Sequence, residues 1–211
     1  MKSWQPEHLG EFLAAASHDR QHAVWHLAAT TGLRRGELCG LRWSDIDFDR
    51  RTLTVRNTRV VASGTIHETT PKTEKGARTI SLDKATLDAL RRLRAQQNAQ
   101  QLANGHEWRN HSGYVTVEED GNPTHPQRLS HRFKAICKKH QLPQIRLHDV
   151  RHSYVVAARR AGASLKTVSE RVGHSDVTVT LKVYDHVFRE DDSRAAEDTA
   201  ELIYTEARER R

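Results

Sequence analysis

The sequence lacks any long apolar run. None of its hydrophobic stretches approaches the roughly 18 consecutive apolar residues of a transmembrane helix, and its first residues do not form the basic and then apolar pattern of a secretory signal. Hydrophobic residues make up 36% of the 211 and charged residues 29%. This balance predicts a soluble protein with a highly charged surface, no membrane partner, and enough length to bury a core.

Cysteine is also scarce. The chain has two, Cys39 and Cys137, far apart and each in a stretch of helical periodicity. This is not the cysteine usage of a small secreted domain held by disulfides. We therefore expect two reduced thiols in a cytoplasmic protein.

Positive charge is plentiful and unevenly distributed. The net charge is +7 and the isoelectric point is about 9.7. Residues 125–182 hold twelve Lys and Arg against three Asp and Glu, whereas residues 189–211 hold five Arg against eight Asp and Glu. A basic block of this density is typical of a surface that binds a polyanion, with nucleic acid as the first expectation. The alternative is a solvated charged face.

Most of the chain has the periodicity of amphipathic helices. Leu9, Phe12 and Leu13, for example, recur at helical spacing after Pro6, a residue favoured in the first turn of a helix. Gly32 is expected to end the second helix. Helices are expected at about 6–17, 19–31, 34–41, 83–104, 126–141, 148–161, 164–172, 177–183 and 192–208.

Between about 52 and 82 the period changes to two. Leu53 and Val55 alternate with polar residues, the region 60–66 predicts a strand pair or an irregular hairpin, and another strand is expected at 78–82. Residues 105–125 are rich in Gly, Asn, His and Pro and predict a loop. The predicted fold is therefore α+β and mostly helical, with a small antiparallel sheet of about three strands on a helical core.

The segment TTGLRRGEL, residues 30–38, places a glycine turn before a helix start. Arg34 beside the unpaired N–H groups of that helix start would make a seat for a phosphate. Glu37, three residues later, could orient the Arg34 guanidinium by a hydrogen bond. The alternative is an ordinary surface Arg–Glu pair.

His148 and Arg151 lie three residues apart, so both side chains project from one face of a helix. Arginine offers a planar fork of donors that matches phosphate oxygens, and histidine can move a proton near neutral pH. Together they could hold and polarise a phosphodiester. The alternative is a histidine at a helix start beside a solvated arginine.

The same five residues, HDVRH, resemble the HExxH pattern of zinc enzymes. Asp149 is one methylene shorter than the general-base Glu of that pattern, and Arg151 would place a fixed positive charge beside the metal. With fourteen histidines in the chain, a chance pair at this spacing is common. No metal site is therefore expected.

Two further candidates cannot be chosen by chemistry alone. Lys72, in the polar turn PKTEKG at 71–76, is expected at a hairpin turn, where a lysine is usually only solvated but can also donate a proton to a leaving oxygen. Of four tyrosines, none is distinguished by composition, although Tyr184 follows a Gly-His pair and a short predicted helix.

These segments, in this order, resemble the catalytic domain of the tyrosine recombinases, the phage integrase family. TGLRRGEL at 31–38 is similar to the first arginine box, PKT at 71–73 to the hairpin lysine, HDVRHS at 148–153 to the second box, GHS at 173–175 to the third, and TLKVYDHV at 180–187 to the nucleophile segment. The resemblance assigns catalytic roles to Arg34, Lys72, His148, Arg151, His174 and Tyr184, with Glu37 as the acidic companion of the first arginine.

The resemblance implies a reaction without metal or cofactor. Arg34, Arg151 and the two histidines would bind the scissile phosphate, and Tyr184 would attack it to form a 3′-phosphotyrosyl bond. Lys72, or alternatively Lys75, would protonate the leaving 5′ oxygen.

The resemblance covers about 4–188, which implies a catalytic domain over 1–188 and an acidic helical tail over 189–211. Family members usually carry an N-terminal DNA-binding domain before the first box, and we expect that domain to be absent from this chain. The implied partners are double-stranded DNA and other protomers in a synaptic tetramer, the chain being a monomer without DNA. The tail would dock on its own domain or on a neighbouring protomer. The expected location is the cytoplasm of a prokaryotic cell or a phage-infected host.

Basic residues near the boxes and in the basic block are predicted to contact DNA: Arg35, Lys75, Arg78, Arg128, Arg132, Lys138, Lys139 and Arg146. Two other functions remain as alternatives. One is a type IB topoisomerase, which shares the chemistry but relaxes supercoils. The other is a DNA-binding module that has lost catalysis, which the complete set of catalytic residues disfavours.

Overall fold

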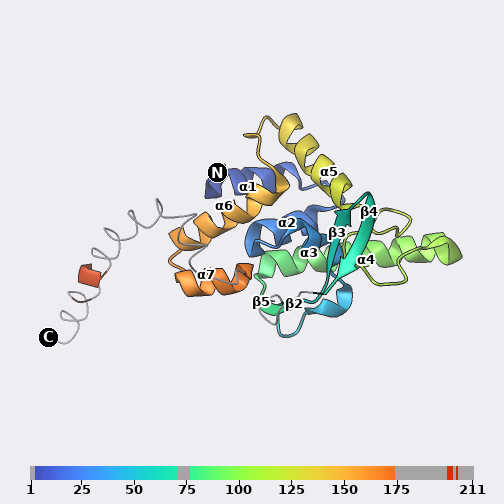
Figure 1. Cartoon of the computed structure of the whole chain (residues 1–211), viewed down its shortest axis with the longest axis horizontal. Helices are drawn as coiled ribbons and strands as arrows, with labels where there is room; N and C mark the ends of the chain where they lie inside the picture. The colour runs from blue at the N-terminus through green and yellow to red at the C-terminus, as the bar shows by residue number, and fades with distance from the viewer. Residues whose placement is uncertain (1–2, 71–76, 174–198, 202, 204–211) are drawn as a thin grey trace.

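The computed structural model describes residues 3–70, 77–173, 199–201 and 203. Helices and strands alternate in blocks, and the α+β, mostly helical fold is confirmed (Figure 1). The helices are α1 Pro6–Ala15, α2 His22–Thr31, α3 Arg35–Gly40, α4 Lys84–Asn104, α5 Pro126–Lys139, α6 Leu147–Arg160 and α7 Leu165–Val172, with short 3-10 turns η1 Trp43–Asp45 and η2 Gly105–Glu107. The strands are β1 Ile46–Asp47, β2 Thr52–Val55, β3 Thr58–Ala62, β4 Thr65–Thr69 and β5 Arg78–Ser81.

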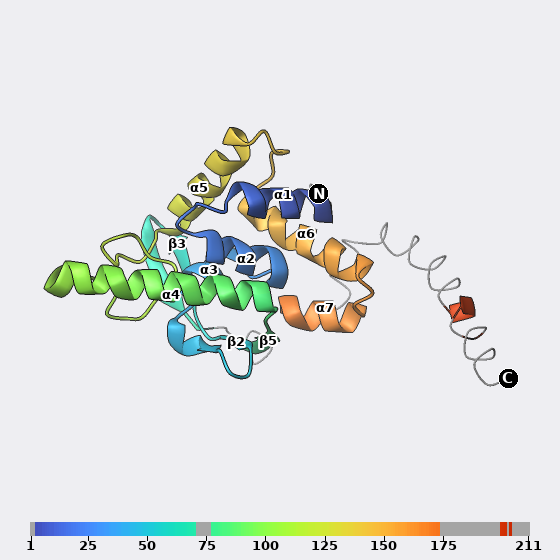
Figure 2. The same cartoon turned by 180° about the vertical axis from the view of Figure 1, so that it is seen from behind.

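The core forms where α1, α2, α5 and α6 meet. Trp4, Phe12, Trp25 and Phe133 come from three helices and the N-terminal segment, and their rings contact one another at centroid distances of 4.9–6.1 Å. Such aromatic side chains bury large apolar areas, which stabilises the fold. Helix α2 packs against both α4 and α6, and Figure 2 shows α4 extending well past this core. The helix expected at 83–104 is confirmed as α4.

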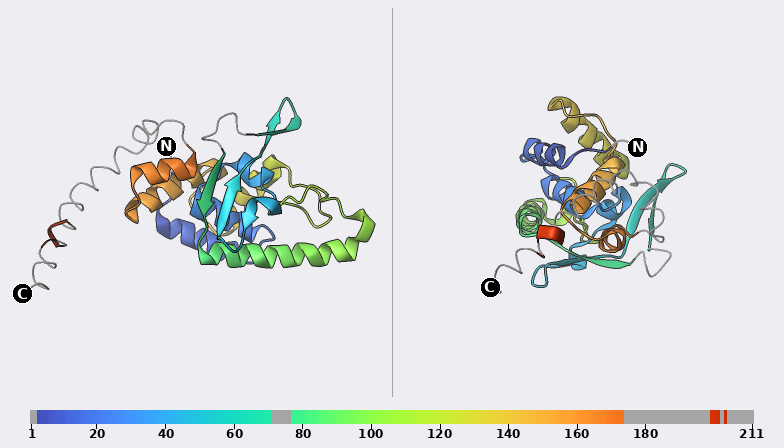
Figure 3. Two further views of the ribbon diagram at one scale, coloured as in Figure 1. Left: turned by 90° about the horizontal axis from the view of Figure 1, so that it is seen from below. Right: turned by 90° about the vertical axis from the view of Figure 1, so that its left-hand side faces the viewer.

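The strands form two sheets. The larger is antiparallel with the order β1-β2-β5, and Leu53 pairs with Ile80, both facing the core. Strands β3 and β4 form a separate hairpin that projects from the body (Figure 3). Three strands were predicted for one sheet, and the number is right for the larger sheet, but β1 was not expected in it.

Strands β4 and β5 pair with different partners. Because β4 pairs with β3 and β5 pairs with β2, the chain between them joins two sheets. PKT at 71–73 is predicted to lie at a hairpin turn, and this segment falls between β4 and β5, outside the described residues. Lys72 itself lies outside the described residues.

Two other predictions, the free thiols and the loop, are confirmed. Cys39 and Cys137 are buried free thiols, and burial raises the pKa of the first to about 12 and of the second to about 11. The loop at 105–125 contains only η2 and isolated bridges at Tyr114 and Val117. In the described part of the chain, no helix has the length and apolar character needed to cross a membrane. Of the predicted helices at 177–183 and 192–208, only residues 199–201 and 203 are described, and these are helical.

Candidate active site

Two glycines in left-handed conformation end the helices that border the site. Gly32, after α2, has φ of 65°, and Gly173, after α7, has φ of 67°. A side chain is disfavoured at such a position because Cβ approaches the backbone. At Gly32 an added Cβ would also lie 2.5 Å from Cδ1 of Tyr154. The glycines of the first and third boxes are therefore required by both backbone and packing.

Gly32→Ala is expected to lower the free energy of unfolding by about 2–4 kcal/mol, from the left-handed backbone and from the clash with Tyr154 together. Gly162→Ala is the matched control, since Gly162 also has positive φ but an added Cβ meets nothing within 4 Å. It should cost only about 1 kcal/mol. Urea denaturation of both variants measures the difference. Equal losses in the free energy of unfolding would show that the clash with Tyr154 does not contribute to the destabilisation.

Arg34 stands at the N-cap of α3 with extended backbone. Its Nη1 donates to Glu37 Oε1 at 2.9 Å, and its backbone N–H donates to Glu37 Oε2 at 2.7 Å. Nη2 reaches the carbonyl oxygen of Gly173, also at 2.9 Å. The predicted orientation of Arg34 by Glu37 is confirmed, and with 41% of its side chain exposed the guanidinium can still meet a ligand.

Glu37 is buried and accepts hydrogen bonds from two arginines. Besides Arg34, it binds Arg78, whose Nη1 and Nη2 donate to Oε1 and Oε2, both at 3.0 Å. Burial raises the pKa of the Glu37 carboxyl, but the hydrogen bonds and charge of Arg78, followed by those of Arg34, outweigh it and leave the pKa below its ordinary value. Glu37 is thus an ionised group at neutral pH.

Arg151 is buried, which excludes the alternative of a solvated arginine. Its Nη1 donates to the carbonyl oxygen of Gly32 at 2.9 Å, and its Nη2 donates to that of Val172. Both carbonyls lie at the C-terminal ends of helices, where unpaired carbonyls and the helix dipole favour a cation. The ends of α2 and α7 therefore hold this guanidinium in place.

His148 lies one turn before Arg151 on α6 and is exposed. Partial burial of its ring, followed by the charge of Arg151, lowers the pKa of His148. Its ring meets that of His152 edge to face at a centroid distance of 5.3 Å, and burial followed by the charge of His148 lowers the pKa of His152 to about 4. His148 is therefore mainly neutral at pH 7 and able to accept a proton.

The predicted catalytic residues separate into two groups. The structure brings Arg34, Glu37 and Arg151 together at the ends of α2 and α7. His148 lies near enough for the charges of Arg151 and Arg34 to lower its pKa. Lys72, Lys75, His174 and Tyr184 lie outside the described residues, although Gly173, which directly precedes His174 in sequence, binds Arg34. No group of three or more potential metal ligands occurs among the described residues.

Most predicted DNA contacts are on the surface, several with acidic partners. Nε of Arg128 lies 3.6 Å from Oε1 of Glu118, and Nε of Arg132 donates to Oδ2 of Asp19 at 2.7 Å. Nη1 of Arg35 donates to the hydroxyl oxygen of Ser130 on α5. The side chains of Lys138 and Lys139 are exposed at the end of α5.

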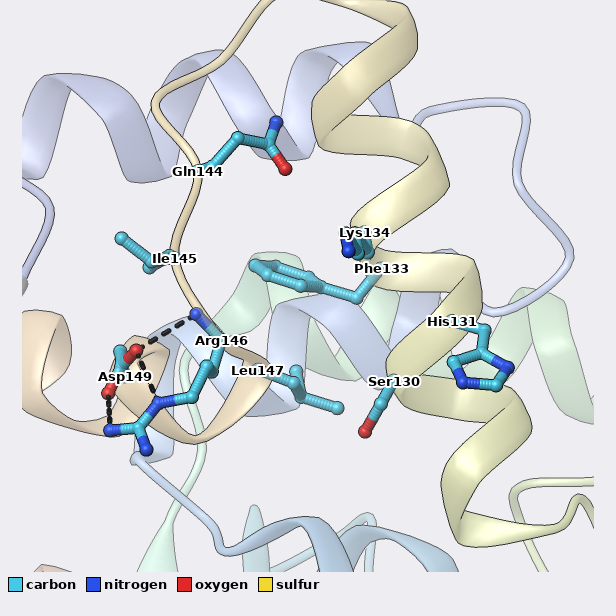
Figure 4. Close-up of a pocket in the computed structure, with 9 residues that line it drawn as sticks. All are labelled: Ser130, His131, Phe133, Lys134, Gln144, Ile145, Arg146, Leu147 and Asp149. Carbon is cyan, nitrogen blue, oxygen red and sulfur yellow. Dashed lines mark hydrogen bonds and ion pairs between the residues drawn. The ribbon is translucent and has the colours of Figure 1, made fainter.

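Arg146, another predicted contact, is 76% exposed and turns back onto Asp149, to whose carboxylate it donates at 2.7 and 3.0 Å (Figure 4). It borders a pocket of about 500 Å³ between α5 and the start of α6. The other residues that line this pocket are Ser130, His131, Phe133, Lys134, Gln144, Ile145, Leu147 and Asp149.

Arg78 is the exception, and its prediction as a surface DNA contact is wrong. Only 7% of its side chain is exposed, and it binds Glu37 in the interior. The burial of β5 alternates, so Arg78 shares the inner face of the strand with Ile80. That two-residue spacing from a core isoleucine was the sequence signal for a buried arginine.

Comparisons with known proteins agree with this geometry. Residues 4–191 match the phage integrase family. The chain is 32% identical to a XerC-like tyrosine recombinase of Caldanaerobacter subterraneus subsp. tengcongensis and 32% identical to the ICEBs1 integrase of Bacillus subtilis, in each case over 96% of this chain and 55% of the relative. The chain thus spans about half the length of these curated relatives.

Solved structures show the same fold. The Tn1549 transposon integrase in complex with a circular intermediate DNA superimposes with a TM-score of 0.73 at 24% identity, over 92% of this chain and 66% of that one. The XerA recombinase superimposes with a TM-score of 0.69 at 20% identity, over 92% and 63%. With the family match over most of its length, and with the first and second boxes assembled at one site, the chain belongs to the phage integrase family, the tyrosine recombinases.

Proposed function

We propose that this chain is the catalytic domain of a site-specific DNA recombinase that cleaves and rejoins DNA through a 3′-phosphotyrosyl intermediate on Tyr184. The observation that carries the proposal is the convergence of two arginines distant in sequence. Arg34 binds the carbonyl of Gly173, and Arg151 binds that of Val172, the neighbouring residue. Two positive charges so close together are suited to the non-bridging oxygens of one phosphate.

The residues would act on a phosphodiester as follows. The Tyr184 oxygen attacks phosphorus and forms the new bond, while the bond from phosphorus to the 5′ oxygen breaks. An ordinary tyrosine has a pKa of about 10, so a neutral His148 is suited to take the phenol proton. Lys72, or Lys75, supplies the proton that the leaving 5′ oxygen needs. His174 would assist the arginines at the phosphate.

The reaction exchanges one phosphodiester for another, so no nucleotide hydrolysis is required. A 5′-hydroxyl of a partner strand then attacks the phosphotyrosyl bond, which releases Tyr184 and completes strand transfer. Chemical balance requires only proton transfers within the site. The roles assigned to Arg34 and Arg151 are to bind the phosphate and to stabilise the charge that develops on it.

Double-stranded DNA and further protomers are the proposed partners, in the cytoplasm of a bacterial or phage-infected cell. Support comes from the basic block at 125–182 and from the related Tn1549 integrase, whose structure holds a circular intermediate DNA. The acidic tail at 189–211 carries the wrong charge for a DNA surface, and docking on a neighbouring protomer or on its own domain is proposed for it.

Trapping a covalent protein–DNA complex tests the proposal. Duplexes with a randomised core and a nick in one strand are suitable, because the short 5′-hydroxyl fragment diffuses away after cleavage and prevents religation. The wild-type chain should give complexes that survive detergent and disappear on nuclease treatment, and sequencing of the captured DNA should converge on one site. Relaxation of supercoiled plasmid without exchange between two copies of that site would instead identify topoisomerase activity.

A further inference from the structure

The C-terminal end of α7 binds three arginines in succession. The carbonyl oxygen of Arg171 accepts from Arg78 Nε at 2.7 Å, that of Val172 from Arg151, and that of Gly173 from Arg34. The last carbonyls of a helix have no partner within the helix, and they carry its negative dipole end. Each of the three guanidiniums is thereby located against the same helix end, and Arg78 belongs to this cluster as fully as the two box arginines.

Arg78 differs from Arg34, whose side chain is 41% exposed, in being buried, and it differs from Arg151 in binding Glu37 directly. Its two terminal nitrogens bind the two carboxylate oxygens of Glu37 in a fork-to-fork pair, at 3.0 Å each. Gly173 packs against its guanidinium, and a Cβ there would lie 3.0 Å from Nη1. Arg78 is held on three sides, by Glu37, by Arg171 and by Gly173.

Glu37 transmits this constraint to Arg34. Its Oε1 accepts from both Arg78 and Arg34, and its Oε2 accepts from Arg78 and from the Arg34 backbone. The carboxylate therefore lies between a buried and a partly exposed guanidinium. Without Arg78, it would have Arg34 alone as a charged partner, and it could turn to pair with both terminal nitrogens of Arg34.

We infer that Arg78 is a positioning residue for DNA cleavage, which fixes the Glu37 carboxylate from the buried side and so leaves the Arg34 guanidinium aimed at the scissile phosphate. The inference rests on the proposed function. It assigns to Arg78 a role in the reaction without contact to DNA, because Nη1 and Nη2 both pair with the Glu37 carboxylate and Nε binds the carbonyl of Arg171.

Because the charge of Arg78 acts on the titratable Glu37 carboxyl, the role of Arg78 should appear in the pH dependence of cleavage. Arg78 and Arg34 are the two groups that lower the pKa of Glu37 against the effect of its burial. On the elements packed against α3, Arg59 of β3 lies over the Tyr114 ring, Ser130 of α5 binds Arg35, and His22 and His26 of α2 contact each other. Removing Arg78 therefore leaves a buried carboxyl with one cation, and its pKa should rise.

The experiment compares Arg78→Met with Arg59→Met. Arg59 is also buried, but its guanidinium binds the Tyr114 ring and the Thr124 carbonyl. Single-turnover formation of the covalent adduct is measured at saturating DNA and at pH 6 and pH 8, using the nicked duplex selected by the wild-type chain. Relative to the wild type at the same pH, Arg78→Met should be slower by about 10²-fold at pH 8. The loss should be larger at pH 6, because a raised pKa of Glu37 increases its protonated fraction as the pH falls. Any loss in Arg59→Met should be equal at both pH values.

Combining Arg78→Met with Glu37→Gln shows whether Arg78 acts through the Glu37 carboxylate. If Arg78 acts through the carboxylate, Arg78→Met should cost much less in that background than in the wild type. The same loss at both pH values, together with full additivity to Glu37→Gln, would overturn the inference and leave Arg78 a purely structural residue. Should Arg78→Met fail to fold, Arg78→Lys serves instead: it keeps the charge, loses the fork, and should be about 10-fold slower. A wild-type rate in Arg78→Lys would also overturn the inference.

A DNA-free measurement separates this inference from the proposed function. The ¹³C resonance of the Glu37 carboxyl, followed against pH, should titrate at higher pH in Arg78→Met, or in Arg78→Lys if less strongly, than in the wild type. If the titration moves but the wild type forms no adduct with any duplex, the proposed function fails and the Arg78–Glu37 link stands. An unmoved titration overturns the link itself.

Discussion

Replacing Tyr184 by phenylalanine is expected to abolish the covalent complex with DNA and to leave DNA affinity unchanged. The change removes the one oxygen proposed to attack phosphorus and keeps the aromatic ring. Loss of a nucleophile from an enzyme of this kind costs at least about 10⁴-fold in rate. Water, if it reached the phosphate instead, would leave no protein attached. The amount of detergent-resistant adduct measures formation of the covalent complex, and fluorescence anisotropy with the same duplex measures DNA affinity.

Tyr114→Phe is the control for this change. The Tyr114 hydroxyl donates to Glu68 at 2.7 Å, and no role in cleavage is proposed for it. This variant should form adduct at close to the wild-type rate. Persistence of the adduct in Tyr184→Phe would mean that another residue is the nucleophile, and loss in both variants would mean that the assay reports stability and not chemistry.

Arg151→Lys is expected to damage both folding and cleavage. The planar guanidinium of arginine donates to the carbonyls of Gly32 and Val172 together. The ammonium group of the shorter lysine side chain can donate to only one of them. A buried polar group without a partner costs about 1–3 kcal/mol, and the expected loss in the free energy of unfolding is roughly 2–4 kcal/mol. Cleavage should fall by about 10²–10³-fold, since a fixed donor to the developing charge is lost.

Arg91→Lys provides the same chemical change at a surface site. Arg91 on α4 is 55% exposed and pairs with Asp88, so its replacement should stay within about 0.5 kcal/mol of the wild type. Urea denaturation gives the stabilities, and adduct formation is measured at a temperature where circular dichroism shows Arg151→Lys to be folded. Full cleavage activity in folded Arg151→Lys would remove Arg151 from the proposed phosphate site.

The helices could be predicted because their apolar periodicity is local. Leu9 and Phe12 on α1 are three residues apart, so their spacing alone identifies the buried face. The sheets could be predicted less well, because pairing between strands is a long-range choice. The short β1 carries only Ile46 as a core residue, too little for a periodic signal, and nothing in the segment before Arg78 shows that β5 pairs with β2 and not with β4.

The same distinction applies to the site, where local contacts could be predicted from the sequence and long-range contacts could not. The bond between Arg34 and Glu37 could be predicted, since residues three apart at a helix start are close whatever the rest of the chain does. The burial of Arg151 could not, because its partners are carbonyls at the ends of α2 and α7, which only the assembled fold brings together. The charge of Arg78 predicts a place on the DNA surface, whereas its pairing with the core residue Val55 across the sheet places it in the interior.

Peptide mapping of the trapped adduct tests the central claim most directly. After nuclease trims the DNA to a short remnant, protease digestion and mass spectrometry should locate a nucleotide bound through a 3′ phosphate to the peptide that contains Tyr184. A remnant on any other residue, or cleaved DNA that carries no protein, would contradict the claim that Tyr184 is the nucleophile of a recombinase.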